Sequence, residues 1–164
     1  KSIVKGSVFD RLQVRIYDSL FVELFAGSGS MGLEALSRGA KKALFIEKDP
    51  ACLKVLKKNI ASIDKENSTI FSGDTFSLAD DIVIFCKKTE LPTFLYIDPP
   101  FDIREGNEDI YQKCIRIIEK IDITQIEEVI IEHNSKSPFD EKIASLAKVA
   151  TKKFGATSLS IYKQ

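Results

Sequence analysis

Residues 21–32 read FVELFAGSGSMG, an apolar segment that runs into a glycine-rich turn and then into good helix formers. Gly27 and Gly29 can adopt positive φ and, lacking a Cβ, allow a ligand to lie against the backbone. The following helix directs its free N–H groups and the positive end of its dipole at that ligand. The spacing Gly27-x-Gly29-x-x-Gly32, with Glu47 20 residues after Gly27, is typical of a nucleoside-cofactor site in a Rossmann-like fold. We therefore expect a strand, a turn and a helix here, with Glu47 bound to ribose hydroxyls.

The glycine spacing alone does not distinguish a dinucleotide from S-adenosyl-L-methionine. Glu23 lies inside the first strand, four residues before Gly27. A carboxylate there would repel a diphosphate, whereas it would attract the ammonium and sulfonium groups of S-adenosylmethionine. Glu23 thus favours S-adenosylmethionine as the cofactor, with an NAD-dependent oxidoreductase as the alternative. The residues expected at the cofactor belong to this turn and to the ends of the next two strands: Glu23, Phe25, Ala26, Gly27, Ser28, Gly29, Glu47, Lys48, Asp74 and Thr75.

Asp74 follows a third short strand, predicted at 69–71, and has two interpretations. At that place in such a fold an aspartate can accept a hydrogen bond from the adenine amino group. It can equally be the N-cap of a helix beginning near Phe76. The sequence leaves both open.

Composition limits the class of protein. A chain of 164 residues, 44% hydrophobic and 29% charged, is predicted to form a single soluble domain over 1–164. No apolar run reaches the length of a membrane span. Three scattered cysteines and one histidine, His133, argue against disulfides and metal sites and favour the cytoplasm; we assign His133 no role. The net charge of zero gives no global case for nucleic acid binding.

The hydrophobic pattern predicts alternating strands and helices followed by a hairpin. Residues 1–20 are predicted to form a helix whose basic side, with Lys5, Arg11 and Arg15, is more readily a solvated face than an RNA contact. The further helices are expected at 31–38, 50–60, 75–86, 108–121 and 140–147. The strands are expected at 21–25, 43–47, 69–71, 94–97, 129–132, 148–154 and 158–162. This is an α/β, doubly wound, mostly parallel Rossmann-like sheet with a C-terminal antiparallel β-hairpin. A dehydrogenase would continue with more βα units, so the hairpin also favours methyl transfer.

The tetrad Asp98-Pro99-Pro100-Phe101 directly follows the apolar strand predicted at 94–97. Two consecutive prolines fix the backbone and remove two N–H donors, so the Asp98 carboxylate and the Pro99 carbonyl are presented as acceptors. Such acceptors suit a substrate amino group, and Phe101 offers a face on which a flipped-out base can stack. The loop after this strand lies beside the glycine turn in such a sheet. We therefore predict that these four residues form the catalytic site of an amino methyltransferase.

These residues resemble one family. Asp98–Phe101 is similar to the [Asp/Asn]-Pro-Pro-[Tyr/Phe] motif of amino-methylating class I methyltransferases. Within that group, ELFAGSGSMGLEALSRGA (23–40), FIEKD (45–49), YIDPPF (96–101) and VKGSVFDRL (4–12) resemble the bacterial 16S ribosomal RNA guanine-N2 methyltransferases of the RsmD type, which are guanine(966)-N2 specific. Gly6 stands where that family usually has glutamate.

The resemblance implies an activity and a partner. Glu23 and 27–29 would hold the methionine part of the cofactor, Glu47 the ribose and Asp74 the adenine, while Asp98, Pro99 and Phe101 would engage a guanine of small-subunit ribosomal RNA or of the 30S particle. We expect a monomer that uses no metal. The sequence starts at Lys1, and we expect the family's N-terminal RNA-binding segment to be missing from it. Adenine-N6 and protein-glutamine targets remain open, because both also present an amino group.

Overall fold

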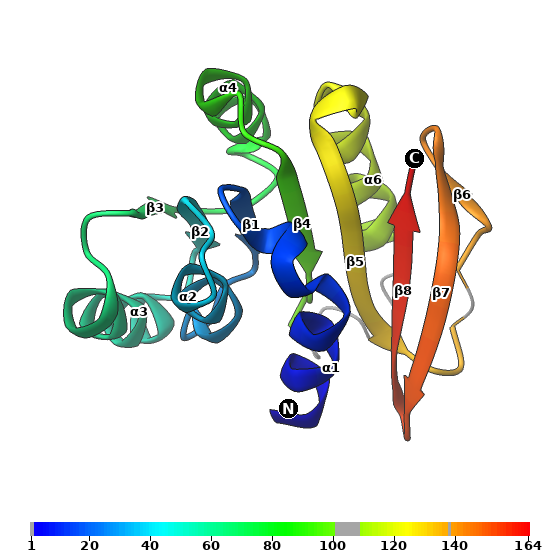
Figure 1. Ribbon diagram of the computed structural model, residues 1–164, viewed down its shortest axis with the longest axis horizontal. Helices are drawn as coiled ribbons and strands as arrows, with labels where there is room; N and C mark the ends of the chain where they lie inside the picture. The colour runs from blue at the N-terminus through cyan, green and yellow to red at the C-terminus, as the bar shows by residue number, and fades with distance from the viewer. Residues whose placement is uncertain (1, 101–108, 138) are drawn as a thin grey trace.

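The structure, a computed structural model, describes residues 2–100, 109–137 and 139–164, and these form one eight-stranded sheet with helices on both faces (Figure 1). In chain order the elements are α1 (Ser2–Leu12), η1 (Gln13–Ile16), β1 (Leu20–Leu24), α2 (Ser30–Ser37), β2 (Lys42–Glu47), α3 (Pro50–Ile63), β3 (Ser68–Ser72), α4 (Ala79–Thr89), β4 (Thr93–Ile97), α6 (Asp109–Lys120), η2 (Ile123–Gln125), β5 (Ile126–Asn134), β6 (Lys142–Ile143), β7 (Leu146–Phe154) and β8 (Thr157–Lys163). Phe101, which we predicted in the catalytic tetrad, lies outside the described residues.

The sheet has the strand order β3-β2-β1-β4-β5-β8-β7-β6. The pairs from β3 to β5 are parallel, and the pairs β5–β8, β8–β7 and β7–β6 are antiparallel. The predicted α/β fold with a C-terminal antiparallel hairpin is therefore confirmed. The strand order reverses at β1 and β4, and ligands of open α/β sheets bind outside the carboxyl ends of the strands at such a point.

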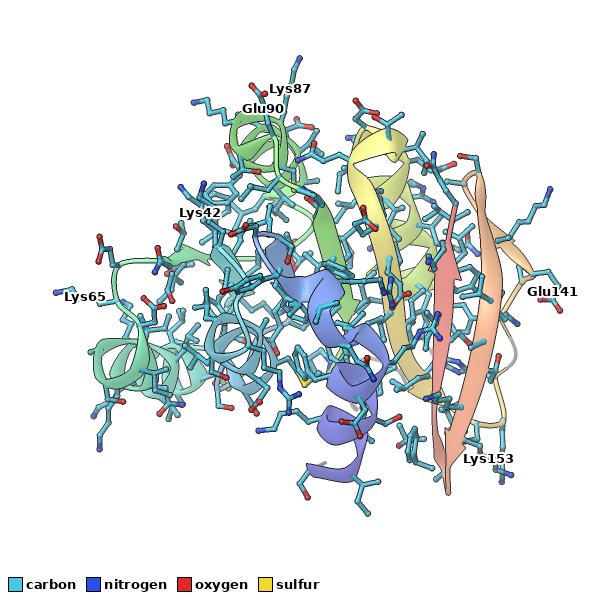
Figure 2. All side chains as sticks on the ribbon, in the orientation of Figure 1. Lys42, Lys65, Lys87, Glu90, Glu141 and Lys153 are labelled. Atoms are coloured by element: carbon cyan, nitrogen blue, oxygen red, sulfur yellow. The ribbon has the colours of Figure 1, made fainter. Side chains whose placement is uncertain are left out.

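Two hydrophobic layers cover the sheet, one on each face. Alternate residues of the strands face opposite layers, which is why β1 and β4 are apolar along nearly their whole length and buried on both sides. On one face the strands pack against α1, α2 and α3. On the other face they pack against α4 and α6. Figure 2 shows side chains filling the space between the ribbons, while labelled charged residues such as Lys65, Lys87 and Glu141 project outward.

Individual residues determine how two helices near the site begin and pack. Asp49 is the N-cap of α3, where its carboxylate accepts from the backbone N–H of Cys52 at 3.0 Å and Pro50 opens the helix. Gly32 lets α2 approach β2 closely, because a Cβ on it would meet the ring of Phe45. The helix expected to begin at residue 50 is confirmed at that end.

The predicted helix at 140–147 is wrong. The chain forms β6 and the start of β7, with Ile143 opposite Leu146 across a tight turn. Both of these side chains are buried. Ile143 and Leu146 are three positions apart, which is also the spacing of apolar residues on one face of a helix. A two-residue turn between strands therefore has the same apolar pattern as a helix.

Two other helices differ at their ends. The N-terminal helix stops at Leu12 and continues as the 3₁₀ segment η1, so β1 already begins at Leu20. Helix α4 begins at Ala79 and ends at Thr89, so it starts four residues later and ends three residues later than predicted. Residues 75–78 form a turn instead of the first turn of that helix.

The basic side of α1 is partly an internal contact. Arg11 and Arg15 each place a guanidinium nitrogen 3.2 Å from Oε1 of Glu128, a fully buried residue of β5. The interpretation of these two arginines as a solvated face is therefore wrong. They attach the N-terminal segment to the sheet, each through one guanidinium nitrogen.

Candidate active site

A cavity of about 1180 Å³ lies at the carboxyl ends of the parallel strands. Its walls come from the segments that follow β1, β2, β3 and β4, including Gly27, Glu47, Asp74 and Asp98. Leu24 and Ile97 are register partners at the ends of β1 and β4, so the glycine turn and the Asp98 segment leave the sheet beside each other. The structure thus brings the two predicted motifs to one cavity. It also lines the cavity with Phe25, Lys48 and Thr75, which were predicted with them.

The glycine turn is held in an unusual backbone conformation. Gly27 has φ of 58° and Gly29 has φ of 81°, and the N–H of Gly29 donates to the carbonyl of Ala26 at 2.9 Å. A Cβ on Gly27 would meet nothing within 4 Å, which leaves room for a ligand against the backbone. Phe25 also has a positive φ, 64°, which no sequence pattern indicated. A bulky residue in this region is strained, and such strain concentrates at functional sites.

Glu47 connects the second strand to the glycine turn. Its Oε1 accepts from the backbone N–H of Gly27 at 2.7 Å, and its Oε2 accepts from Lys48 N–H at 3.0 Å and from Asp49 N–H at 2.9 Å. These bonds fix the carboxylate at the cavity wall. The predicted ribose contact stays a prediction, and a carboxylate has acceptor positions for further donors besides these three.

Glu23 lies beneath the turn rather than in the large cavity. It is 5% exposed, its Oε1 accepts from Gly32 N–H at 2.9 Å, and burial raises its pKa to about 8. It lines a second cavity, of about 440 Å³, together with Tyr96, Asp98 and Glu132. Ala26 and Ser28 line this cavity too, so nine of the ten predicted cofactor residues divide between two adjoining cavities that share Gly27. Gly29 lines neither of them, because the space beside its Cα is filled by the side chains of Leu56 and Phe45.

Asp74 is not the N-cap of a helix beginning near Phe76, because α4 begins at Ala79 and Leu78 is its N-cap. Oδ2 of Asp74 accepts from the backbone N–H of Ser77 at 3.0 Å and from the Ser77 hydroxyl at 3.2 Å. It therefore caps the turn that precedes α4. The residue still lines the large cavity, next to Thr75, so an adenine contact stays a prediction.

Asp98 lines both cavities, and Pro99 and Pro100 line the larger one. Tyr96 of β4 faces the layer that contains α1, and Asp98 follows the last residue of that strand. The structure places this part of the tetrad where the sequence predicted it. The catalytic role of these residues stays a prediction.

Sequence reasoning missed Glu132 and Tyr96. Glu132 is 2% exposed, lines both cavities and accepts from the Tyr96 hydroxyl at 3.3 Å through Oε1. A signal was present, because Glu132 ends the apolar run that begins at Val129, just as Glu47 ends and Asp98 follows an apolar run. His133, next to it, donates through Nδ1 to the carbonyl of Asn134 at 2.9 Å and accepts from the Ser160 hydroxyl at 2.7 Å. It contributes to the packing of β5 against β8, as expected of a residue with no assigned role.

Comparison with known proteins identifies the family. The sequence model of the family described as conserved hypothetical protein 95 matches residues 1–163. The chain belongs to this family. It is the family of RsmD-type methyltransferases, in agreement with the resemblance of the sequence motifs.

Two relatives illustrate the range of the family. A candidate rRNA methyltransferase of Bacillus subtilis, YlbH, is 26% identical over 98% of this chain and 84% of its own. The ribosomal RNA small subunit methyltransferase D of Escherichia coli is 35% identical over 71% of this chain. That match spans about half the length of the Escherichia coli protein, 53%.

Solved structures share the fold. A candidate methyltransferase from Escherichia coli, YhhF, superimposes with a TM-score of 0.78 at 25% identity and covers 98% of this chain and 84% of its own. An RNA methyltransferase from Salinibacter ruber, solved with S-adenosylhomocysteine, gives a TM-score of 0.65 at 17% identity and covers 99% and 91%. The class I methyltransferase fold is thereby confirmed, and the dehydrogenase alternative is not favoured.

Two features are absent from residues 2–100, 109–137 and 139–164. No helix among them is both long and apolar enough to cross a membrane. Within the same residues, no group of three or more His, Cys, Asp and Glu side chains has an arrangement suited to a metal ion.

Proposed function

We propose that this protein transfers the methyl group of S-adenosylmethionine to the exocyclic N2 amine of a guanine in small-subunit ribosomal RNA. The observation that carries the proposal is the position of Asp98, which lines one cavity with Gly27, Glu47 and Asp74. A nucleoside cofactor on the glycine turn and an amino group at Asp98 would then meet in one space. Family membership and the Escherichia coli relative supply the class of substrate.

The residues present suit S-adenosylmethionine. Gly27 offers backbone without a side chain, Glu47 and Asp74 offer acceptors for ribose hydroxyls and an adenine amino group, and the carboxylate of Glu23 would attract the ammonium. When bound, the cofactor supplies a methyl group on a positively charged sulfur. Because Glu23 is buried with a pKa of about 8, a cation beside it would favour the ionised form.

Asp98 and Pro99 would prepare the amine. The lone pair of an aryl amine is delocalised into the ring, and two oxygen acceptors holding the two N–H bonds favour tetrahedral character at nitrogen. The carboxylate of Asp98 also compensates the positive charge that develops on nitrogen and is placed to accept the proton that the amine loses. The remainder of the effect is positioning, because the rigid Pro99-Pro100 pair fixes where the acceptors lie.

We place the activity in the cytoplasm, on RNA or the assembling 30S particle, by a monomer. Radiolabelled methyl transfer by the full-length protein to unmodified small-subunit RNA and to unmodified 30S particles tests this, with nuclease digestion and mass spectrometry to identify the product. We expect N2-methylguanosine, and mapping would show whether the nucleotide is guanine(966), as the resemblance implies. N6-methyladenosine, methylglutamine in ribosomal protein or no transfer at all would refute the proposal.

A further inference from the structure

Glu132 of the neighbouring strand β5 lies next to Asp98, which follows β4. Ile97 of β4 and Ile131 of β5 are register partners, and Asp98 and Glu132 are the residues that follow them. Both carboxylates belong to the walls of the two adjoining cavities. The site therefore offers acceptors from two adjacent strands, whereas the predicted mechanism uses only those of Asp98 and Pro99.

The orientation of Glu132 is fixed by a buried tyrosine. The Tyr96 hydroxyl donates to Oε1 of Glu132 at 3.3 Å, and Tyr96 and Glu132 are 3% and 2% exposed. Burial, and next the nearby Glu132 carboxylate, raise the pKa of Tyr96 far above its ordinary range, so its proton remains in place as a donor. A carboxylate accepts at about four positions, so the tyrosine bond leaves it able to accept from a substrate.

We propose that the carboxylate of Glu132 accepts the N1–H of the target guanine and thereby selects guanine over adenine. This inference rests on the proposed function. In guanine the N1–H and the N2 amine are neighbouring donors on one edge, which matches neighbouring acceptors at Glu132 and Asp98. Adenine carries an acceptor at N1, so its ring nitrogen would face an acceptor-only carboxylate at a buried position. A base lacking the N1 proton would place its N1 lone pair against the carboxylate, and such a mismatched buried contact is what gives hydrogen-bonding sites their discrimination.

The change Glu132→Gln tests the inference. The substrates are two small-subunit RNAs assembled by splinted ligation, one that keeps the mapped guanine and one that carries 2-aminopurine in its place. That base keeps the 2-amino group but has an acceptor at N1. The wild-type protein is expected to methylate guanine at least about 10²-fold faster than 2-aminopurine, as kcat/KM. In Glu132→Gln the amide can present an N–H to N1 of 2-aminopurine. The ratio of kcat/KM for guanine to that for 2-aminopurine is therefore expected to fall at least about tenfold, because methylation of guanine becomes slower and methylation of 2-aminopurine becomes faster.

Cofactor affinity distinguishes a role of Glu132 in base recognition from a role in cofactor binding. Calorimetry with S-adenosylhomocysteine should give Kd values within about twofold for wild type and Glu132→Gln, as for a residue that contacts only the base. Tyr96→Phe, which removes the donor but keeps the ring, should lower the same discrimination ratio to a smaller extent. It provides a second measurement if Glu132→Gln does not fold.

The outcomes are distinguishable. If the wild-type protein methylates guanine but Glu132→Gln keeps the full ratio, or if its cofactor affinity falls with its activity, Glu132 does not read N1 and the proposed function stands. If wild type methylates no guanine in RNA, the proposed function fails, and this inference fails with it.

Discussion

The buried carboxylate of Glu23 accepts the backbone N–H of Gly32 at 2.9 Å, which joins the first strand to the first turn of α2. The bond satisfies one of the N–H groups that a helix start leaves free. Burial nevertheless raises the pKa of Glu23 to about 8, so the carboxyl group is largely protonated at neutral pH when no cation lies beside it.

This pKa makes stability depend on pH. The folded pKa is about 8 against a reference value of 4.5, so the unfolded chain releases the proton first as pH rises. Between these values the free energy of unfolding should fall with pH, by at most about 1.4 kcal/mol per pH unit from this group. The change Glu23→Gln keeps the oxygen that accepts from Gly32 and removes the titration. Urea unfolding at pH 5, 7 and 8.5 measures the free energy of unfolding at each pH. We expect it to fall more steeply with pH in the wild-type protein than in Glu23→Gln.

The control is Asp80→Asn, a change at an exposed carboxylate of α4, which should leave the slope of the wild-type protein. If Glu23→Gln unfolds with the same pH dependence as wild type, Glu23 titrates normally in the folded chain.

Asp98→Ala should abolish methyl transfer. Loss of the charged acceptor at the reacting nitrogen is expected to reduce kcat by about 10²-fold or more, by analogy with removal of one preorganised hydrogen-bonding group. Asp98→Asn keeps an oxygen acceptor and should retain more activity than Asp98→Ala. Single-turnover transfer measures the rate, and calorimetry with S-adenosylhomocysteine checks that the cofactor still binds. Normal transfer by Asp98→Ala would overturn the catalytic assignment.

Gly32→Ala should destabilise the fold. The added Cβ would lie 2.7 Å from Cζ of Phe45 and 3.3 Å from Oε1 of Glu23, so the helix must move away from the sheet. Overpacking of this kind costs about 1–3 kcal/mol. Gly6→Ala is the matched control, because nothing lies within 4 Å of a Cβ there and Gly6 is inside α1. That change should stabilise by about 0.5–1 kcal/mol. Equal effects of the two changes in urea unfolding would contradict the close packing of α2 on β2.

Glu128→Gln should weaken the attachment of α1. Arg11 and Arg15 would lose their shared carboxylate while keeping their place against the sheet. Loss of one partner of a buried ion pair costs about 3–5 kcal/mol, and we expect about 2–3 here because the two arginine side chains remain partly exposed. Asp80→Asn removes the exposed contact with Lys120 and should change stability by less than about 1 kcal/mol. A similar small effect for Glu128→Gln would show that the arginines are held by packing alone.

The parts of the fold with local signals were predictable. The glycine turn, the Asp49-Pro50 helix start and the apolar strands each follow from residues a few positions apart, and parallel pairing then brings Gly27 and Asp98 to the same edge. This is why most of the candidate site could be placed before the structure was known. Asp74 shows the limit of such prediction. The sequence alone could not decide between a local hydrogen-bonding role and a contact with the cofactor for this residue.

The features that were missed depend on distant pairings. Glu128 is more than a hundred positions from Arg11 and Arg15, and no local pattern relates them. The apolar pair Ile143 and Leu146 fits a helix or a tight hairpin equally, and the pairing of β6 with β7 decided it. Glu132 became a site residue only because β5 lies beside β4, which puts it next to Asp98.

The place of β8 in the sheet has a consequence for synthesis. This strand lies between β5 and β7, although β7 precedes it in the sequence. While a ribosome is still adding Thr157–Lys163, the edge of β5 has no neighbour on that side, and an exposed strand edge is prone to pair with other chains. A nascent chain would therefore be most vulnerable to aggregation just before these residues emerge, and ribosome stalling at that point would prolong the exposure.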